Sequence, residues 1–223
     1  MPTSTLGRTT IALHASLELS PNLDGKPRER CPSIHFSRID GNGRREIAQF
    51  RSDTEQPRLD LPDCSINTIE IGNILARVID EEAWLMELHR VLTPGGYLCF
   101  KLPATGPLAW LDARNMYRYV VDIVGRGNEP DDTLPTGWHR HYSEHDILQL
   151  LQTTGFTHRT IQRVGLGFPE IPQMAGLLVG NFLLGRRDTE RRLQPLRTRT
   201  EAIDQEFSVP KIGTTIYVLA ART

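Results

Sequence analysis

Two histidines and a tyrosine stand close together past the middle of the chain, where they could contact a substrate. His139 and His141 lie two residues apart in the segment WHRHY, directly before Tyr142 in the same segment. An imidazole changes its charge near neutral pH, so such a pair can supply a base or a hydrogen bond to a ligand. As metal ligands the two histidines lack partners, and we expect no metal. The residue types therefore predict a substrate contact at residues 139–142.

The elements that must position these side chains centre on residues 61–102. β-branched residues over 66–71 predict a short buried strand. Residues 80–92 carry apolar side chains at helical spacing, with acids at the start and basic residues near the end, as the helix dipole favours. Pro94 and two glycines end this helix, and residues 97–102 predict a second buried strand. Together they predict a βαβ unit with a parallel strand pair.

This segment resembles the central part of class I S-adenosylmethionine (SAM) dependent methyltransferases of the small-molecule type. Two stretches carry the resemblance, LPDCSINTIEI before the first strand and ELHRVLTPGGYLCF between the helix and the second strand. A weaker match runs over 139–156. The resemblance implies a three-layer, Rossmann-like α/β fold with an antiparallel last strand, SAM as cofactor, and methyl transfer to a small molecule.

The expected cofactor loop departs from the family's pattern. In the family the first strand ends in a glycine-rich loop, because only glycine lets the backbone approach the cofactor closely. Here we expect a strand over 9–15, and the loop from His14 to Leu19 contains no glycine. The resemblance implies cofactor contacts from His14, Ala15, Ser16 and Glu18, with Glu18 bonding the SAM amino group. The alternative is a loop that has lost the cofactor site.

Two aspartates are candidates for the ribose and adenine of the cofactor. Asp40 ends an expected strand over 33–39, where the family has an acid that accepts hydrogen bonds from ribose hydroxyls. Alternatively, residues 40–43 (Asp-Gly-Asn-Gly) form a hairpin turn and 44–50 fold back antiparallel. Either way this half of the sheet is abbreviated, without room for a helix between its second and third strands. Asp53 stands where the family has an acid near the adenine amino group, although a solvated loop aspartate fits equally.

Asn73 follows the first strand of the central unit. The resemblance places it facing the methyl acceptor, together with His139, His141 and Tyr142. An asparagine orients a hydroxyl or amine by hydrogen bonding but cannot act as a general base. We therefore expect positioning by Asn73 and any proton transfer from the histidines.

Composition limits the classes of protein that this chain can belong to. The 223 residues, 39% of them hydrophobic, suffice for a single domain over residues 1–223 with a polar tail at 1–8. A net charge of −1 gives no reason to expect a nucleic-acid partner. Three widely spaced cysteines are typical of reduced thiols. No apolar run approaches the roughly 20 residues of a spanning helix, so we expect a cytoplasmic protein without a transmembrane segment.

Residues 165–192 form an apolar stretch that ends in four arginines, namely Arg186, Arg187, Arg191 and Arg192. The stretch could be a flap over a lipophilic substrate, a subunit contact in a homodimer, or a peripheral contact with a membrane surface. The alternative is a helix packed on its own domain.

Two main functions therefore stay open. The first is a SAM-dependent methyltransferase acting on a small molecule, hydrophobic if 165–192 is a flap. The second is a catalytically inactive methyltransferase-like protein that binds or regulates a partner. An enzyme that has reused the cleft for other chemistry is a third.

Overall fold

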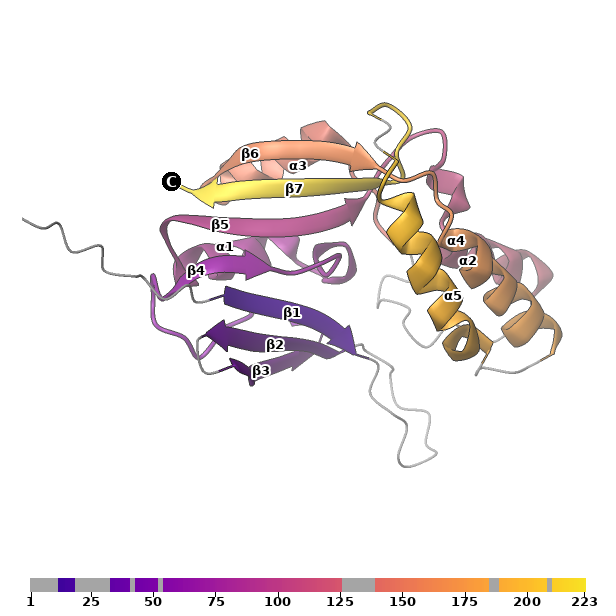
Figure 1. The fold of residues 1–223 in the computed structure, drawn as a ribbon, viewed down its shortest axis with the longest axis horizontal. Coiled ribbons are helices and arrows are strands. Elements are labelled where there is room, and N and C mark those ends of the chain that lie inside the picture. The colour runs from indigo at the N-terminus through magenta and orange to yellow at the C-terminus, as the bar shows by residue number, and fades with distance from the viewer. Residues whose placement is uncertain are drawn as a thin grey trace, which may run out of the picture.

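The computed structural model describes residues 12–18, 33–40, 43–51, 54–125, 139–184, 189–207 and 210–223. These residues form a mixed seven-stranded sheet in the order β3-β2-β1-β4-β5-β7-β6 (Figure 1). The strands are β1 (Ala12–Glu18), β2 (Ser33–Asp40), β3 (Gly43–Arg51), β4 (Ile66–Glu70), β5 (Leu92–Pro103), β6 (Phe156–Val164) and β7 (Thr215–Arg222).

The predicted βαβ unit is confirmed. β4 and β5 are parallel, and helix α1 (Glu81–Val91) lies between them in the chain. Asp80 caps α1, since its Oδ1 accepts a hydrogen bond from the backbone N–H of Ala83 at 2.9 Å. The last strand, β7, is antiparallel to β5, as expected, and β6 is antiparallel to β7.

The two glycines between α1 and the buried part of β5 are required by the backbone. Gly95 has a φ of +74°, in the left-handed region that favours glycine. A Cβ on Gly96 would lie 2.9 Å from the carbonyl oxygens of Asn67 and Thr93, closer than real Cβ contacts. These glycines therefore let β5 bulge between Leu92, which pairs with Ile66, and Tyr97, which pairs with Thr68.

Glu87 and Arg90, from the same motif, hold the backbone that leads into β4. Glu87 Oε1 accepts hydrogen bonds from the N–H of Leu59 at 2.6 Å and from Arg90 Nη2 at 2.7 Å. Arg90 also donates to the carbonyl oxygens of Leu59 (3.1 Å) and Leu61 (2.9 Å). The hydrogen bond to Glu87 raises the pKa of Arg90 further above its ordinary value. Glu87 and Arg90 thus stabilise the fold.

The N-terminal strands form an antiparallel meander. β2 pairs antiparallel with both β1 and β3, and Asp40 pairs with Gly43 across the turn, so the hairpin interpretation of 40–43 is confirmed. The hairpin packs on α1 through Trp84, whose ring centroid lies 5.8 Å from that of Phe36 and 5.4 Å from that of Phe50. β2 consequently runs opposite to β1, β3, β4 and β5 (Figure 1).

The expected loop at His14 is wrong, because β1 continues as a strand to Glu18. Its residues pair with β2 along their whole length, from Ala12 opposite Ile39 to Glu18 opposite Ser33. The physical reason is the antiparallel neighbour. β2 offers partners to the backbone N–H and C=O groups of residues 14–18, which keeps them extended.

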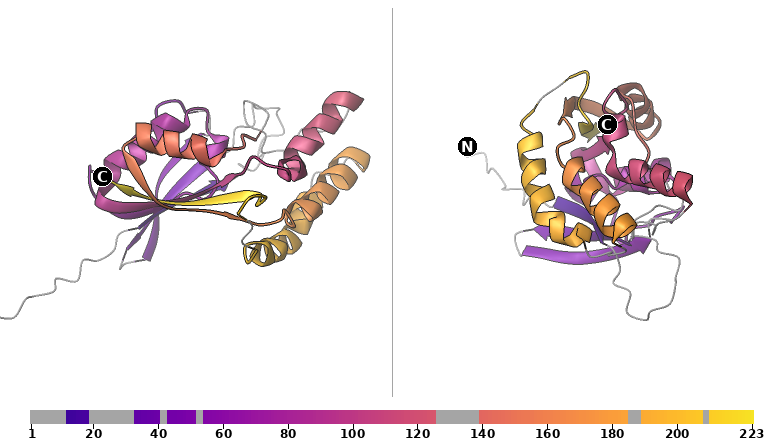
Figure 2. Two further views of the ribbon diagram at one scale, coloured as in Figure 1. Left: turned by 90° about the horizontal axis from the view of Figure 1, so that it is seen from above. Right: turned by 90° about the vertical axis from the view of Figure 1, so that its right-hand side faces the viewer.

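The described residues form two layers, a sheet and the helices on one of its faces, where we expected three. Helices α1 and α3 (Glu144–Thr153) cover one face, and no helix of the described residues crosses the other face (Figure 2). Only the C-terminal end of α5 (Thr189–Asp204) reaches that side, where Lys101 Nζ lies 2.6 Å from Glu201 Oε1. Only two residues join β2 to β3, which leaves no length for a covering helix.

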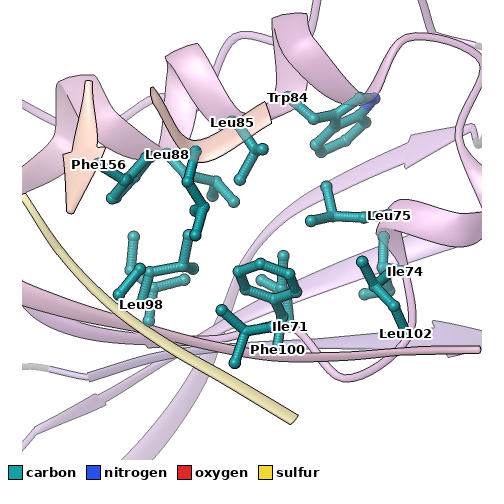
Figure 3. Close-up of a cluster of buried hydrophobic side chains, with 14 of the residues drawn as sticks. Ile71, Ile74, Leu75, Trp84, Leu85, Leu88, Leu98, Phe100, Leu102 and Phe156 are labelled. Carbon is teal, nitrogen blue, oxygen red and sulfur yellow. The ribbon is translucent and has the colours of Figure 1, made fainter. Parts of the chain in front are cut away.

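The hydrophobic core lies between the sheet and its two covering helices. Strand β4 contributes Ile69 to this core. Strand β5 contributes Leu98, Phe100 and Leu102, and α1 contributes Trp84, Leu85 and Leu88 (Figure 3). The buried side chains on β5 alternate with more exposed ones, as expected for a strand with one covered face.

A separate group of helices lies beyond the carboxyl ends of the parallel strands (Figures 1 and 2). It comprises α2 (Ala113–Val124), α4 (Glu170–Ala175), the π-helical η3 (Gly176–Leu183) and α5; short 3₁₀ turns η1 (Leu75–Arg77) and η2 (Ala109–Leu111) precede it in the chain. Ala113, Tyr117 and Leu177 form its small buried core. Segment 165–192 therefore contributes to its own domain, yet Leu183 and Leu184 stay 70% and 59% exposed. Across the described ranges, no helix is long and apolar enough to span a membrane.

Candidate functional site

A cleft lies where the helical group meets the carboxyl ends of β4 and β5, and we call it the carboxyl-edge cleft. Ligands of open α/β sheets bind at this edge. The cleft has a volume of about 120 Å³, which is enough for a small molecule. The lining residues that could bind a ligand include Asn73, Asp112, His139, His141, Glu170, Gln173 and Arg197.

Asp112 joins the start of α2 to the two histidines. Its Oδ1 accepts hydrogen bonds from the backbone N–H groups of Arg114 and Asn115, both at 3.0 Å, which caps the helix. Its Oδ2 lies 3.2 Å from His139 Nδ1 and 3.5 Å from His141 Nε2. Burial alone would raise the pKa of Asp112, but the His139 contact and the Asn115 N–H outweigh it and lower the pKa to about 2. Asp112 is therefore ionised at neutral pH.

His139 is held at both its backbone and its ring. Asn115 Nδ2 donates to the His139 carbonyl at 3.1 Å, and its Oδ1 accepts from the His139 N–H at 2.9 Å. Burial, opposed by the hydrogen bond to Asp112, lowers the pKa of His139 to about 4, so the ring is neutral at pH 7. Because the Asp112 carboxylate only accepts, Nδ1 carries the proton and Nε2 keeps a free lone pair.

The Nε2 atom of His139 is an unused hydrogen-bond acceptor in the cleft. It is buried and has no hydrogen-bond partner within the described part of the chain. Leaving a buried polar atom unpaired costs about 1–3 kcal/mol. A group with a hydrogen to donate would remove that cost by binding here.

Glu170 brings a second carboxyl group to the same end of α2. It is the first residue of α4, and its Oε2 accepts from the backbone N–H of Ala113 at 2.9 Å. Burial raises the pKa of Glu170, and the charge of Asp112 adds to that shift despite the Ala113 hydrogen bond. The cleft therefore holds one firmly ionised carboxylate, Asp112, and one that binds a proton more readily.

Three of the four residues predicted to face the substrate line the cleft, namely Asn73, His139 and His141. Tyr142 does not. Its side chain is buried in the core, its hydroxyl lies 3.5 Å from the Leu75 carbonyl oxygen, and burial raises its pKa to about 12. Neighbouring residues of an extended segment point to opposite sides, and Tyr142 pairs with Ala104 in such a segment. That alternation turns Tyr142 away from the side of His141.

The residues predicted to hold the cofactor lie in β1 and β2 where the structure describes them. His14 lies in β1, with its Nδ1 2.9 Å from Arg44 Nη2. Ala15, Ser16 and Glu18 also belong to β1, paired with β2. Asp40 follows the residue that pairs with Ala12, so it lies at the edge of the sheet where β1 begins. Asp53 lies outside the described residues.

SAM does not fit the described residues in the way the resemblance implies. β1 offers a paired strand where the family's loop would approach the cofactor. Asp40, the acid expected at the ribose, lies at the end of the sheet where β1 and β4 begin, opposite their carboxyl ends. No chemical step at the cleft can therefore be derived through this cofactor.

Sequence reasoning missed Asp112, Glu170, Gln173 and Arg197. Asp112 had a usable signal, because an aspartate directly before a helical stretch is a typical N-cap. Its contact with His139 joins residues 27 positions apart, which no local pattern encodes. Glu170 and Arg197 come from a segment whose apolar residues dominated the pattern.

Comparison with known proteins finds similarity to solved structures at low sequence identity. No protein-family model matches it. No curated protein matches it either. Many solved structures of class I SAM-dependent methyltransferases resemble it at low identity over about 74% of its length.

Three of these structures illustrate the likeness. A loganic acid methyltransferase with SAH is 14% identical, with a TM-score of 0.45, over 74% of this chain and 64% of its own. A SAM-dependent methyltransferase from Mesorhizobium loti is 18% identical, with a TM-score of 0.38, over 75% of this chain and 66% of its own. Another, from Methanosarcina mazei, is 16% identical, with a TM-score of 0.40, over 74% of this chain and 62% of its own. The chain thus spans less than two thirds of the length of these structures, and the likeness concerns the fold alone.

Proposed function

We propose that this methyltransferase-like chain binds a small molecule in the carboxyl-edge cleft through a hydroxyl or amine hydrogen that His139 accepts. The observation that carries this function is the buried Nε2 of His139, which has no partner among the described residues and is fixed by the Asp112 contact at 3.2 Å on the other side of the ring. A hydrogen-bond donor on the ligand satisfies this atom. Asn73, on the same lining, can orient the ligand's second polar group.

The Asp112–His139 pair also gives the cleft acid–base capacity. Asp112 fixes the imidazole in the Nδ1–H tautomer, so the lone pair of Nε2 stays in the cleft. With a pKa near 4, His139 accepts a hydrogen bond in the resting site. It can take the proton fully only from a group that becomes strongly acidic during a reaction.

Histidine tautomers provide the direct test. Protein labelled with ¹⁵N-histidine should show His139 as the neutral Nδ1–H form at pH 7, and small alcohols or amines should shift its Nε2 signal. His158, exposed on β6, serves as the control and should not respond to these ligands. An Nε2–H tautomer at His139, or no response to any alcohol or amine, would contradict the function.

A catalytically inactive binding protein is the second candidate. The observation that favours it is the continuous pairing of β1 with β2 through Glu18, where a cofactor loop was expected. Incubation with methyl-labelled SAM and the ligands that shift His139 separates the two. Label in a product supports a methyltransferase, whereas ligand binding without any transfer supports the binding protein.

A further inference from the structure

We propose that the ligand of the carboxyl-edge cleft is a small hydroxy carboxylate, with its hydroxyl on His139 and its carboxylate on Arg197. This assignment rests on the proposed function, in which His139 Nε2 accepts a hydrogen from the ligand. It adds the chemical class of the molecule. The supporting observations are a second unpaired polar group in the cleft and the charges around both.

Arg197 supplies the second unpaired group. It lies on α5 and lines the cleft from the side of the helical group, whereas His139 comes from the segment before α3. Its Nε is buried and has no hydrogen-bond partner in the ranges that the structure describes. An N–H of a guanidinium can only donate, and carboxylate oxygens are its best-matched acceptors. One cleft therefore presents an unused acceptor and an unused cationic donor.

The acidic residues that line the cleft beside Arg197 accept hydrogen bonds from other groups, although Glu170 and Glu201 also feel the charge of Arg197. Glu201 Oε1 is 2.6 Å from Lys101 Nζ. Asp204 accepts the backbone N–H groups of Leu166 (2.9 Å), Gly167 (3.3 Å) and Phe168 (3.2 Å). Glu170 accepts the N–H of Ala113, and its burial disfavours the charged form. A ligand carboxylate would thus give Arg197 an acceptor that its own neighbours do not provide.

The charges around His139 select a neutral hydroxyl over an ammonium group. Arg77 and Arg114 lie close enough for their charges to help lower the pKa of His139, after the larger effect of burial. The carboxylate of Asp112 acts in the opposite direction, but it contacts Nδ1 on the other side of the ring, so the two arginines oppose an ammonium group at Nε2. A hydroxyl donates its hydrogen without bringing a charge.

Gln173 adds a neutral group that can serve either end of the ligand. It is only 6% exposed and lines the cleft from α4. An amide both donates and accepts, so it can meet a carboxylate oxygen or a hydroxyl.

The test uses glycolate, 3-hydroxypropionate and 4-hydroxybutyrate, in which one to three carbons separate the hydroxyl from the carboxylate. Binding is followed by the His139 Nε2 signal of the full chain. Methoxyacetate, which lacks the hydroxyl, and glycolamide, which lacks the charge, are the matched control ligands. We expect at least one hydroxy carboxylate to bind about tenfold more tightly than the corresponding neutral amide, the effect of one charge-assisted hydrogen bond.

Matched variants assign the carboxylate to Arg197. Arg197→Gln should remove the tenfold preference, and Arg197→Lys should keep part of it. Arg199→Gln, on an exposed position of the same helix, should leave it unchanged. The tautomer of His139 in each variant reports that the site is still folded.

The outcomes separate this assignment from the proposed function. If alcohols shift His139 but no hydroxy carboxylate exceeds its amide, the carboxylate site is refuted and the function stands. A preference that survives Arg197→Gln also refutes the assignment. If His139 has the wrong tautomer and nothing binds, both are refuted together.

Discussion

Asp112 caps helix α2 with one carboxylate oxygen and holds the Nδ1 of His139, at 3.2 Å, with the other. The cap and the imidazole therefore share one side chain. A change at Asp112 must affect both the start of the helix and the tautomer of the histidine.

Replacing Asp112 separates these two roles. In Asp112→Asn the new amide still caps the helix, since asparagine is as good an N-cap as aspartate. Its NH₂ group would face His139 Nδ1, which forces the ring into the Nε2–H tautomer and removes the acceptor from the cleft. Asp112→Ala should lose the cap as well and cost about 1 kcal/mol more in the free energy of unfolding. Urea denaturation and ¹⁵N-histidine spectra measure the two effects; an unchanged tautomer in Asp112→Asn would contradict the assigned contact.

The buried histidine should make stability depend on pH. The pKa of His139 is about 4 in the fold and about 6.5 in an unfolded chain, so the unfolded state binds the extra proton between these values. The contribution of His139 to the free energy of unfolding is then fully present above pH 6.5 and falls as the pH drops toward 4. From pH 7.5 to pH 5 the loss due to this group should be about 2 kcal/mol. Urea denaturation of the wild type and His139→Gln at both pH values measures it; equal pH slopes would contradict the shifted pKa.

Binding of the cofactor product should be weak. Calorimetry with S-adenosylhomocysteine should give an affinity worse than roughly micromolar, about −8 kcal/mol, because β1 is a paired strand instead of an open loop. Asp40→Ala should not change that affinity, given its place at the opposite edge of the sheet. Nanomolar binding would show that the chain holds the cofactor by another route.

Gly165 should tolerate no side chain. Its φ is +81°, and a Cβ there would overlap Asp204 Oδ2, the carboxylate that accepts the N–H groups of residues 166–168. Gly165→Ala should therefore strain the backbone and break hydrogen bonds to Asp204. We expect it to lower the free energy of unfolding by about 3 kcal/mol in all. Gly72→Ala is the control, because its φ of +52° carries strain but its Cβ would meet nothing within 4 Å. It should cost about 1 kcal/mol by thermal unfolding, and equal losses for the two variants would contradict the Asp204 contact.

The apolar segment should divide into core and surface residues. Leu177 is fully buried, so Leu177→Ala should cost about 2–4 kcal/mol. Leu183→Ser with Leu184→Ser should stay within about 0.5 kcal/mol of the wild type, because both side chains are largely exposed. Light scattering of the double variant tests the predicted homodimer, and salt-dependent vesicle binding tests the predicted membrane contact. Unchanged mass and unchanged vesicle binding would leave neither prediction supported.

Local signals in the sequence were enough for the centre of the fold. The β-branched run at 66–71, the amphipathic spacing over 80–92 and the Pro-Gly-Gly turn each act over a few residues, so the βαβ unit and its parallel pair followed from them. The Asp-Gly-Asn-Gly sequence likewise indicated a hairpin, as one of two interpretations. Neither pattern could show that β1 would extend to Glu18, because that depends on pairing with β2.

The candidate site was only partly visible in the sequence. His139, His141 and Asn73 were predicted from residue type and resemblance, and the structure brings all three to one cleft. Their partner Asp112 lies 27 residues from His139, and Arg197 comes from a helix much further along the chain. Tertiary structure decided these contacts because burial and charge proximity depend on which distant elements pack together. The same packing cannot be predicted from local spacing. It lowers the pKa of His139 and leaves its buried Nε2 without a partner among the described residues.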